Sequence, residues 1–332
     1  MAVTDVSRKA LAQSKLPPWV WDAWRIGSSA AVTLLGLLAL TFFIGRMLPI
    51  DPVIAIVGEQ ADASTYDMVY KQLGLDKPLY VQFFKWFGAV LKGDFGVSIW
   101  TGRPVLYEIG IRLELSLQVA IMATILAILI AVPLGTLSAI FKDTWIDHLV
   151  RVISIAGLAV PSFWLGMIII LLLLTYFSWI PPLTFTPFFE DPWKNLSQLI
   201  WPAMAVGYRY SSVAMRMMRS SVLEVLQEDY VRTARAKGVY ERLVVSRHAM
   251  RNALLPVVTV VGLEFAFLIG GLVVTEQVFN LNGIGKLFVQ AVSRGDYTMI
   301  QGLVLLVAVC FVLINFAIDM LYASLDPRIR YR

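Results

Sequence analysis

Hydrophobic residues in this chain are concentrated in six blocks, and polar segments separate these blocks from one another. Each block approaches or exceeds the roughly 20 residues that a helix needs to cross a hydrocarbon layer about 30 Å thick. The fourth block is weaker than the others, because Arg209 and Arg216 interrupt it. The blocks cover residues 28–45, 115–141, 152–180, 199–218, 253–275 and 303–322. This pattern predicts an all-α integral membrane protein with six transmembrane helices.

Helices are favoured over a β-barrel, because the two-residue alternation typical of barrel strands is absent. Pro133, Pro161, Pro202 and Pro256 are expected to interrupt or begin these helices. The prediction divides the chain into a cytoplasmic or interfacial tail over 1–27, a first transmembrane helix over 28–48, an extracytoplasmic loop over 49–113, a core with the other transmembrane helices over 114–325, and a cytoplasmic tail over 326–332.

Lys and Arg residues in the short loops predict the orientation in the membrane. If six helices cross, the basic residues of both termini, of the turn near Lys142 and of the segment 216–251 fall on one side. Cytoplasmic loops carry such a basic excess, so both termini and a coupling segment are expected in the cytoplasm. The long loop after the first helix then lies outside. Within it, residues 79–91 are expected to form a short amphipathic helix.

The composition agrees with a membrane protein. Of the 332 residues, 58% are hydrophobic and 15% are charged, whereas soluble domains have roughly half and about a quarter, respectively. The net charge of +5 fits the basic bias of cytoplasmic loops, so no nucleic-acid partner is expected. Residues 1–27 are polar and precede a block long enough to span, which indicates an uncleaved anchor. Cys310 is the only cysteine, which excludes an intrachain disulfide.

Catalytic, metal and ATP sites are not expected in this chain. Gly285 and Lys286 lack the earlier glycine and the following Ser or Thr of a P-loop, so both the phosphate cradle and the magnesium ligand are missing. The two histidines, His148 and His248, fall in cytoplasmic segments, and no His-Glu-x-x-His pair occurs. This argues against a membrane-embedded hydrolase. We therefore predict no catalytic residue, no metal site and no cofactor bound by this chain.

The cytoplasmic segment between the fourth and fifth blocks has the strongest functional signal. Residues 228–239 place acids at the start and bases towards the end of a predicted helix, which suits the helix dipole. Ala234 and Ala236 permit close approach, and Gly238 is a natural helix stop. A second basic helix is expected to lead to Pro256, where the next span begins. A solvated loop is one interpretation; the pattern favours a helix that docks into a groove on another subunit.

This segment resembles the loop of ABC importer permeases that forms the coupling helix docking on the ATP-binding subunit. In the general pattern, Glu-Ala-Ala is followed by three residues, Gly and a later Leu-Pro. Here Arg232-Thr233-Ala234 stands in the Glu-Ala-Ala place, and Leu255-Pro256 lies further from Gly238. In both departures the chain resembles the dipeptide/oligopeptide/nickel branch of these permeases. The resemblance implies a coupling helix made of Asp229, Tyr230, Arg232, Thr233, Ala234, Arg235, Ala236, Lys237 and Gly238.

Other stretches resemble the same branch, and together they extend the resemblance over most of the chain. They comprise 73–79 and 93–98 in the first outer loop, 278–287 and 294–297 in the last outer loop, and 319–328 at the end. Leu281-Asn282 departs from the branch, which more usually has a proline there.

The resemblance implies a permease subunit of a bacterial inner membrane that forms half of a translocation pathway and works by alternating access. It implies as partners a second homologous permease, two ATP-binding subunits that hold ATP and Mg, an extracytoplasmic substrate-binding protein and the lipid bilayer. Peptides or peptide-like solutes are the expected cargo, with nickel, opines and oligosaccharides as alternatives. A passive channel or a membrane hydrolase is the remote alternative.

Arg209 and Glu264 are ionisable residues well inside the fourth and fifth blocks. At about 1.5 Å per residue, both are expected close to the middle of a layer about 30 Å thick. An unpaired charge at this depth costs on the order of 2.5–3.5 kcal/mol. The two residues are therefore expected to face the bundle interior or a wet pathway. A buried pair that only fixes helix packing, two side chains that line the pathway, and two that never meet remain the alternatives.

Overall fold

The structure is a computed structural model that describes residues 31–43, 46, 51–58 and 60–325. The described residues form helices and loops, with one isolated bridge between Val97 and Pro104 and no strand. The expected all-α class is confirmed for this part of the chain. The predicted tails, 1–27 and 326–332, lie outside the described residues, as do both ends of the first hydrophobic block.

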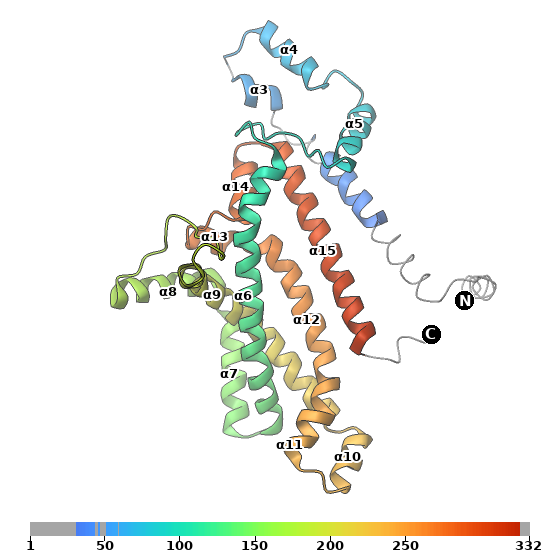
Figure 1. Cartoon of the computed structure of the whole chain (residues 1–332), viewed down its shortest axis with the longest axis vertical. Coiled ribbons are helices and arrows are strands. Elements are labelled where there is room, and N and C mark those ends of the chain that lie inside the picture. The colour runs from blue at the N-terminus through green and yellow to red at the C-terminus, as the bar shows by residue number, and fades with distance from the viewer. Residues whose placement is uncertain (1–30, 44–45, 47–50, 59, 326–332) are drawn as a thin grey trace, which may run out of the picture.

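Helices follow one another along the described chain (Figure 1). After a helix at Ala31–Phe43 come α3 (Pro52–Val57), α4 (Ala63–Gln72), α5 (Leu79–Leu91), α6 (Val105–Ile140), α7 (Trp145–Ala159), α8 (Ser162–Phe177), α9 (Pro192–Val225), α10 (Asp229–Ala236), α11 (Glu241–Leu243), a π-helical segment (Val244–Ala249), α12 (Met250–Gly271), α13 (Val273–Val278), α14 (Ile284–Ser293) and α15 (Tyr297–Leu325). The helix expected over 79–91 is confirmed as α5.

Three stretches of the described chain are helical, long and apolar enough to cross a membrane: Val105–Ile140, Glu241–Gly271 and Tyr297–Ile318. The bent pair of α7 and α8 makes a fourth if it counts as one span. Helix α9 is 34 residues long but carries Arg209 and other basic residues within it. Six transmembrane helices therefore stay a prediction, while a multi-span helical architecture is observed.

The long helices α6, α12 and α15 run along the long axis of the molecule (Figure 1). The helices α3, α4 and α5 of the first predicted outer loop lie at one end of this axis, and α10 and α11 lie at the other end. Phe42 of the first helix packs its ring against Phe83 and Trp86 of α5, which ties that helix to the loop. The fold thus separates the two segments that the predicted topology puts on opposite sides of the membrane.

The third hydrophobic block, 152–180, is not one continuous helix, and the predicted interruption at Pro161 is confirmed. Helix α7 ends at Ala159, α8 begins at Ser162, and the two meet at 100°. Pro161 explains the break, because a proline disfavours helical backbone at the preceding residue, and Val160 is extended with a ψ of 122°. Helix α8 therefore extends sideways from the bundle (Figure 1).

Three other prolines lie inside continuous helices, so the prediction that they interrupt or begin helices is wrong. Pro133 lies within α6, Pro202 within α9 and Pro256 within α12. No helix boundary occurs at Pro256, because α11, the π-helical segment and α12 form one stretch over Glu241–Gly271. A π-helical turn accommodates an additional residue without ending the helix. The basic first part of this stretch is thus continuous with its apolar part.

Helices α6 and α9 run parallel and share the most extensive helix contact of the described chain. A row of small buried residues follows one face of α6 at helical spacing: Ala120, Ala123, Ala127, Ala131 and Gly135. A Cβ on Gly207 of α9 would lie 2.9 Å from the carbonyl oxygen of Ala123, and one on Gly135 would lie 2.7 Å from that of Met215. Small residues let helix backbones approach closely, which is how helices associate in lipid.

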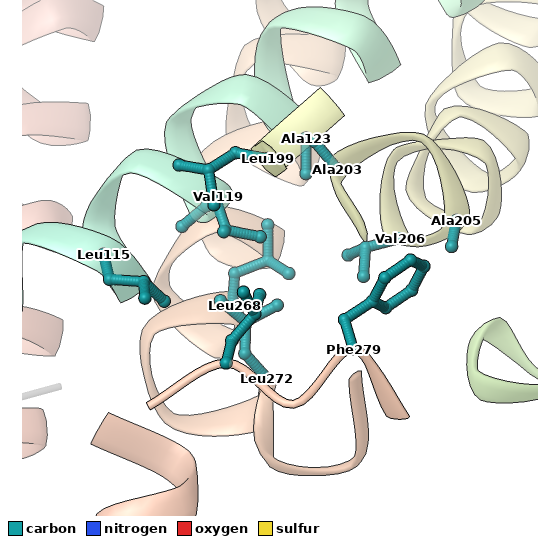
Figure 2. Packing of buried hydrophobic residues seen from close by; sticks show 12 residues of the cluster. Leu115, Val119, Ala123, Leu199, Ala203, Ala205, Val206, Leu268, Leu272 and Phe279 are labelled. Carbon is teal, nitrogen blue, oxygen red and sulfur yellow. The ribbon is translucent and has the colours of Figure 1, made fainter. Parts of the chain in front are cut away.

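The buried cluster around this contact joins α6, α9 and α12. Figure 2 shows Val119 of α6 and Leu199 of α9 together with Leu268 of α12, and Phe279 beside Val206. Because α12 packs on α9 and α6 at once, the three helices form one apolar unit. This unit holds the fourth and fifth hydrophobic blocks, and with them Arg209 and Glu264, in a defined relation to each other.

Gly207→Val is expected to destabilise the protein in detergent, because two added methyl groups would meet the backbone of Ala123. Overpacking of this kind costs about 1–3 kcal/mol, so thermal unfolding should occur at a lower temperature. Gly110→Val in α6 is the matched control, since a Cβ at Gly110 meets nothing within 4 Å. Equal unfolding temperatures for the two variants would contradict the α6–α9 packing described here.

Candidate coupling and pathway sites

Helix α10 is a short helix whose boundaries follow from its own sequence. Asp229 lies in its first turn and Arg235 in its last turn, which complements the helix dipole. Gly238 has a φ of +76°, in the left-handed region that favours glycine. Its N–H donates to the Arg235 carbonyl at 2.9 Å, and the Val239 N–H donates to the Ala234 carbonyl at 3.2 Å. These two hydrogen bonds form a Schellman motif, which is the helix end that a glycine at this position predicts.

One face of α10 packs against its own chain. Val231 and Ala234 are buried and contact Val244 of the π-helical segment. Ala234 is therefore used within the subunit, whereas Ala236 lies on the surface. Of the predicted coupling residues, those exposed are Asp229, Tyr230, Arg232, Thr233, Arg235, Ala236, Lys237 and Gly238. The residues of α10 other than Val231 and Ala234 are therefore exposed, and most of them are polar or small.

Polar contacts fasten α10 to the start of the Glu241–Gly271 stretch. The Tyr230 hydroxyl accepts a hydrogen bond from Asn252 Nδ2 at 2.7 Å. Arg235 makes a two-point contact with Glu241, with N–O distances of 2.7 and 3.1 Å. The hydrogen bond to Glu241 raises the pKa of the Arg235 guanidinium above its already high ordinary value. These contacts join α10 directly to the stretch that contains α12.

A buried ionic cluster at the same end of the bundle was missed by sequence reasoning. The Asp147 carboxylate is wholly buried and accepts two hydrogen bonds from Arg219 of α9, both at 2.8 Å. It also accepts bonds from the Ser138 hydroxyl at 2.5 Å and the Asp143 N–H at 3.1 Å. These contacts clamp the ends of α6, α7 and α9 together, just before the chain enters α10. Asp147 is an acid in the first turn of α7, but nothing local to it identifies Arg219 as its partner.

A second buried carboxylate, Glu276 of α13, holds the start of α14. It is 1% exposed and accepts from the Ser116 hydroxyl at 2.7 Å and from the Lys286 N–H at 2.8 Å. A Cβ on Gly283 would lie 2.2 Å from a Glu276 carboxylate oxygen, so only glycine fits there. The start of α14 is occupied by a protein carboxylate and is no phosphate cradle, which agrees with the predicted absence of a P-loop.

Arg209 lies at the midpoint of α9, and Glu264 lies within α12 on the neighbouring helix. The two charges interact electrostatically with each other and with Tyr210. Among the described residues they form no ion pair within 4.0 Å of each other, and Arg209 is exposed while Glu264 is half-buried. Within the described part of the chain, no group of three or more His, Cys, Asp or Glu residues could hold a metal ion.

A family model described as the binding-protein-dependent transport system inner membrane component matches residues 131–331. A second model, for the N-terminal part of these membrane components, matches residues 24–105. The chain belongs to this family. It is a multi-pass inner-membrane permease component of an ABC importer. The permease is a transport subunit rather than an enzyme, since ATP hydrolysis in such importers lies in separate subunits.

Relatives of this permease include glutathione transport system permease proteins. That of Salmonella typhimurium is 42% identical over 300 residues, which cover 90% of this chain and 95% of the relative. That of Escherichia coli K12 is 41% identical over the same shares of each chain. A chain of the MetNI methionine ABC transporter, solved in inward-facing conformations, matches with a TM-score of 0.54 at 17% identity and covers 67% of this chain and 97% of its own. That likeness concerns the fold alone.

Asp147→Ala is expected to lower the stability of the permease by about 3–5 kcal/mol, because it leaves Arg219 without its counter-ion in a buried site. Glu224→Ala is the control, since Glu224 lies near the same end of α9 and its side chain is exposed. Thermal unfolding of both purified variants in detergent measures the difference. If Asp147→Ala unfolds at the same temperature as the wild type, the cluster does not hold the helix ends together.

Proposed function

We propose that this permease forms half of the translocation pathway for peptides or peptide-like solutes and works by alternating access. Its complex would contain a second homologous permease, two ATP-binding subunits and an extracytoplasmic binding protein. The relatives at 41–42% identity are named for the transport of glutathione, a small peptide-like molecule. The match over 90% of this chain supports a cargo of the same class. Nickel, opines and oligosaccharides are the alternatives that an uptake assay distinguishes.

Coupling in this proposal passes through α10. The observation that carries it is the two-sided character of this helix: Val231 and Ala234 attach it to its own subunit, and the opposite face is polar, small and free. The helix is inserted between α9 and the Glu241–Gly271 stretch, so a push on α10 reaches both. ATP and Mg would bind the partner subunits, and this chain would bind no cofactor.

The opposite end of the molecule is proposed to receive the binding protein. This surface comprises the first outer loop over 49–112, with α3, α4 and α5, and the last outer loop over 277–297. Helix α5 exposes Phe84 and Leu91, and α4 exposes Met68. Helices α4 and α5 lie at the end of the molecule opposite α10 (Figure 1). Cysteine labelling at Asp94 and Asn282 tests this placement, and labelling from the cytoplasmic side alone would refute it.

Gly238→Trp is expected to abolish ATP-driven uptake of short peptides by the complete importer in proteoliposomes while the membrane domain stays folded. The substitution strains the left-handed end of α10 and places a bulky ring on its free face. ATP hydrolysis should continue without transport. Uptake of radiolabelled peptides, in parallel with phosphate release, measures this uncoupling.

Gly238→Asn is the control for this experiment, because asparagine tolerates a left-handed conformation and adds little bulk. It should transport at close to the wild-type rate. Normal uptake by Gly238→Trp would refute the docking of α10. If the wild-type importer takes up nickel or an oligosaccharide and no peptide, the proposed cargo is wrong even where coupling holds.

Arg209 and Glu264 are proposed to face the pathway, where they would meet the charged ends of a zwitterionic solute. The exposed position of Arg209 in the isolated subunit supports this. If the two charges serve only packing, Glu264→Ala should destabilise the protein more than the double variant with Arg209→Ala, because the single change strands a charge. If they line the pathway, both variants should slow uptake alike while thermal stability stays near that of the wild type. Full uptake by the double variant would end this proposal.

A further inference from the structure

A cavity of about 310 Å³ lies between the first turns of α6, the start of α14 and the loop that precedes α9. Its polar wall consists of Arg112, Asn282, Lys286 and Gln290, and Leu115 and Phe185 belong to its apolar wall. No acidic residue is among the described residues that line it. The volume is near the lower limit of small-molecule sites, which range from about 300 to 1,000 Å³.

The cationic groups of the cavity have hydrogen-bond donors to spare. Arg112 uses Nη1 to contact Glu108, and among the described residues its Nε and Nη2 have no partner. Lys286 Nζ donates one hydrogen bond, to Asn280 at 2.9 Å, and an ammonium has three donors. The two carboxylates nearby do not supply the missing acceptors, because both are buried and already bound: Glu108 to Arg112, and Glu276 to Ser116 and the Lys286 N–H.

Both walls of the cavity are held in place by buried contacts. Glu276 fixes the start of α14, and Gly283 leaves no room for a side chain beside it. On the other wall, Phe185 is positioned by its neighbour Thr186, whose N–H donates to Gln198 at 3.1 Å and whose carbonyl accepts from Asn195 at 2.8 Å. The cavity is thus a preformed space and does not depend on a loose loop.

We infer that this cavity is a subsite for the terminal carboxylate of the transported solute. The inference rests on the proposed function, because it takes the cargo to be a peptide and α14 to lie on the outer side. Arg112 and Lys286 would bind the carboxylate through charge-assisted hydrogen bonds, Asn282 and Gln290 would add amide donors, and Leu115 and Phe185 would contact the adjoining side chain. The amides at the start of α14 take no part, since Glu276 and Ser116 already bind them.

The test compares two peptides of one sequence, one with a free terminal carboxylate and one with a terminal amide, in uptake by the complete importer in proteoliposomes. Binding of each peptide to the isolated binding protein is measured separately, so that the comparison concerns the permease. Lys286→Gln should reduce uptake of the free acid about tenfold, the loss expected for one charged hydrogen bond. Uptake of the amide should stay the same. Lys194→Gln is the matched control, because Lys194 is exposed, lies in the first turn of α9 and does not line the cavity.

Gln290→Glu provides a second variant that keeps the size of the wall and adds a repelling carboxylate. It should also reduce uptake of the free acid selectively. Equal slowing of both peptides, or no change in their ratio, would overturn the inference. A loss of affinity for the loaded binding protein would assign the cavity to that partner, and dependence on anionic lipid in the vesicles would assign it to a headgroup; either result also overturns it. Failure of the wild type to import both peptides would instead refute the proposed function.

Discussion

The close parallel packing of α6 against α9 is the contact on which the rest of the structure depends. Lipid provides no hydrophobic force that would bring two apolar helices together, so association depends on close backbone approach. The row from Ala120 to Gly135 on α6, together with Gly207 on α9, allows that approach. Helices α7, α8 and α12 all pack on α9. Helix α9 is therefore the most central helix of the fold, although its basic residues make it only weakly hydrophobic.

This arrangement connects the end of the molecule that holds α10 with the middle of the bundle. Helix α10 lies in the chain between α9, which carries Arg209, and the Glu241–Gly271 stretch, which carries Glu264. Val231 and Ala234 attach α10 to that stretch, and the Asp147 cluster clamps α9 to the α6–α7 turn. Helix α10 is therefore joined, through the chain and through packing, to the helices that carry Arg209 and Glu264.

At the opposite end of the molecule, a buried carboxylate likewise connects several helices. Glu276 joins α13 to the start of α14 and, through Ser116, to α6. The cavity with Arg112 and Lys286 lies beside this junction. A motion that separated α6 from α14 would change the cavity and strain the Glu276 contacts together. The buried Glu276 carboxylate thus connects one wall of the cavity with the packing of the bundle.

The sequence by itself determined the features that depend on short stretches of chain. The hydrophobic blocks indicated a helical membrane protein, residues 79–91 formed α5 as expected, and Gly238 ended α10, because periodicity and a left-handed glycine act locally. Only the tertiary structure decided which prolines break a helix, since Pro161 breaks one and Pro256 does not. It also decided the pairing of Asp147 with Arg219 and of Glu276 with Ser116. Partners so far apart in the chain leave no local pattern, because the packing of α7 on α9, and of α14 on both α13 and α6, is what brings them together.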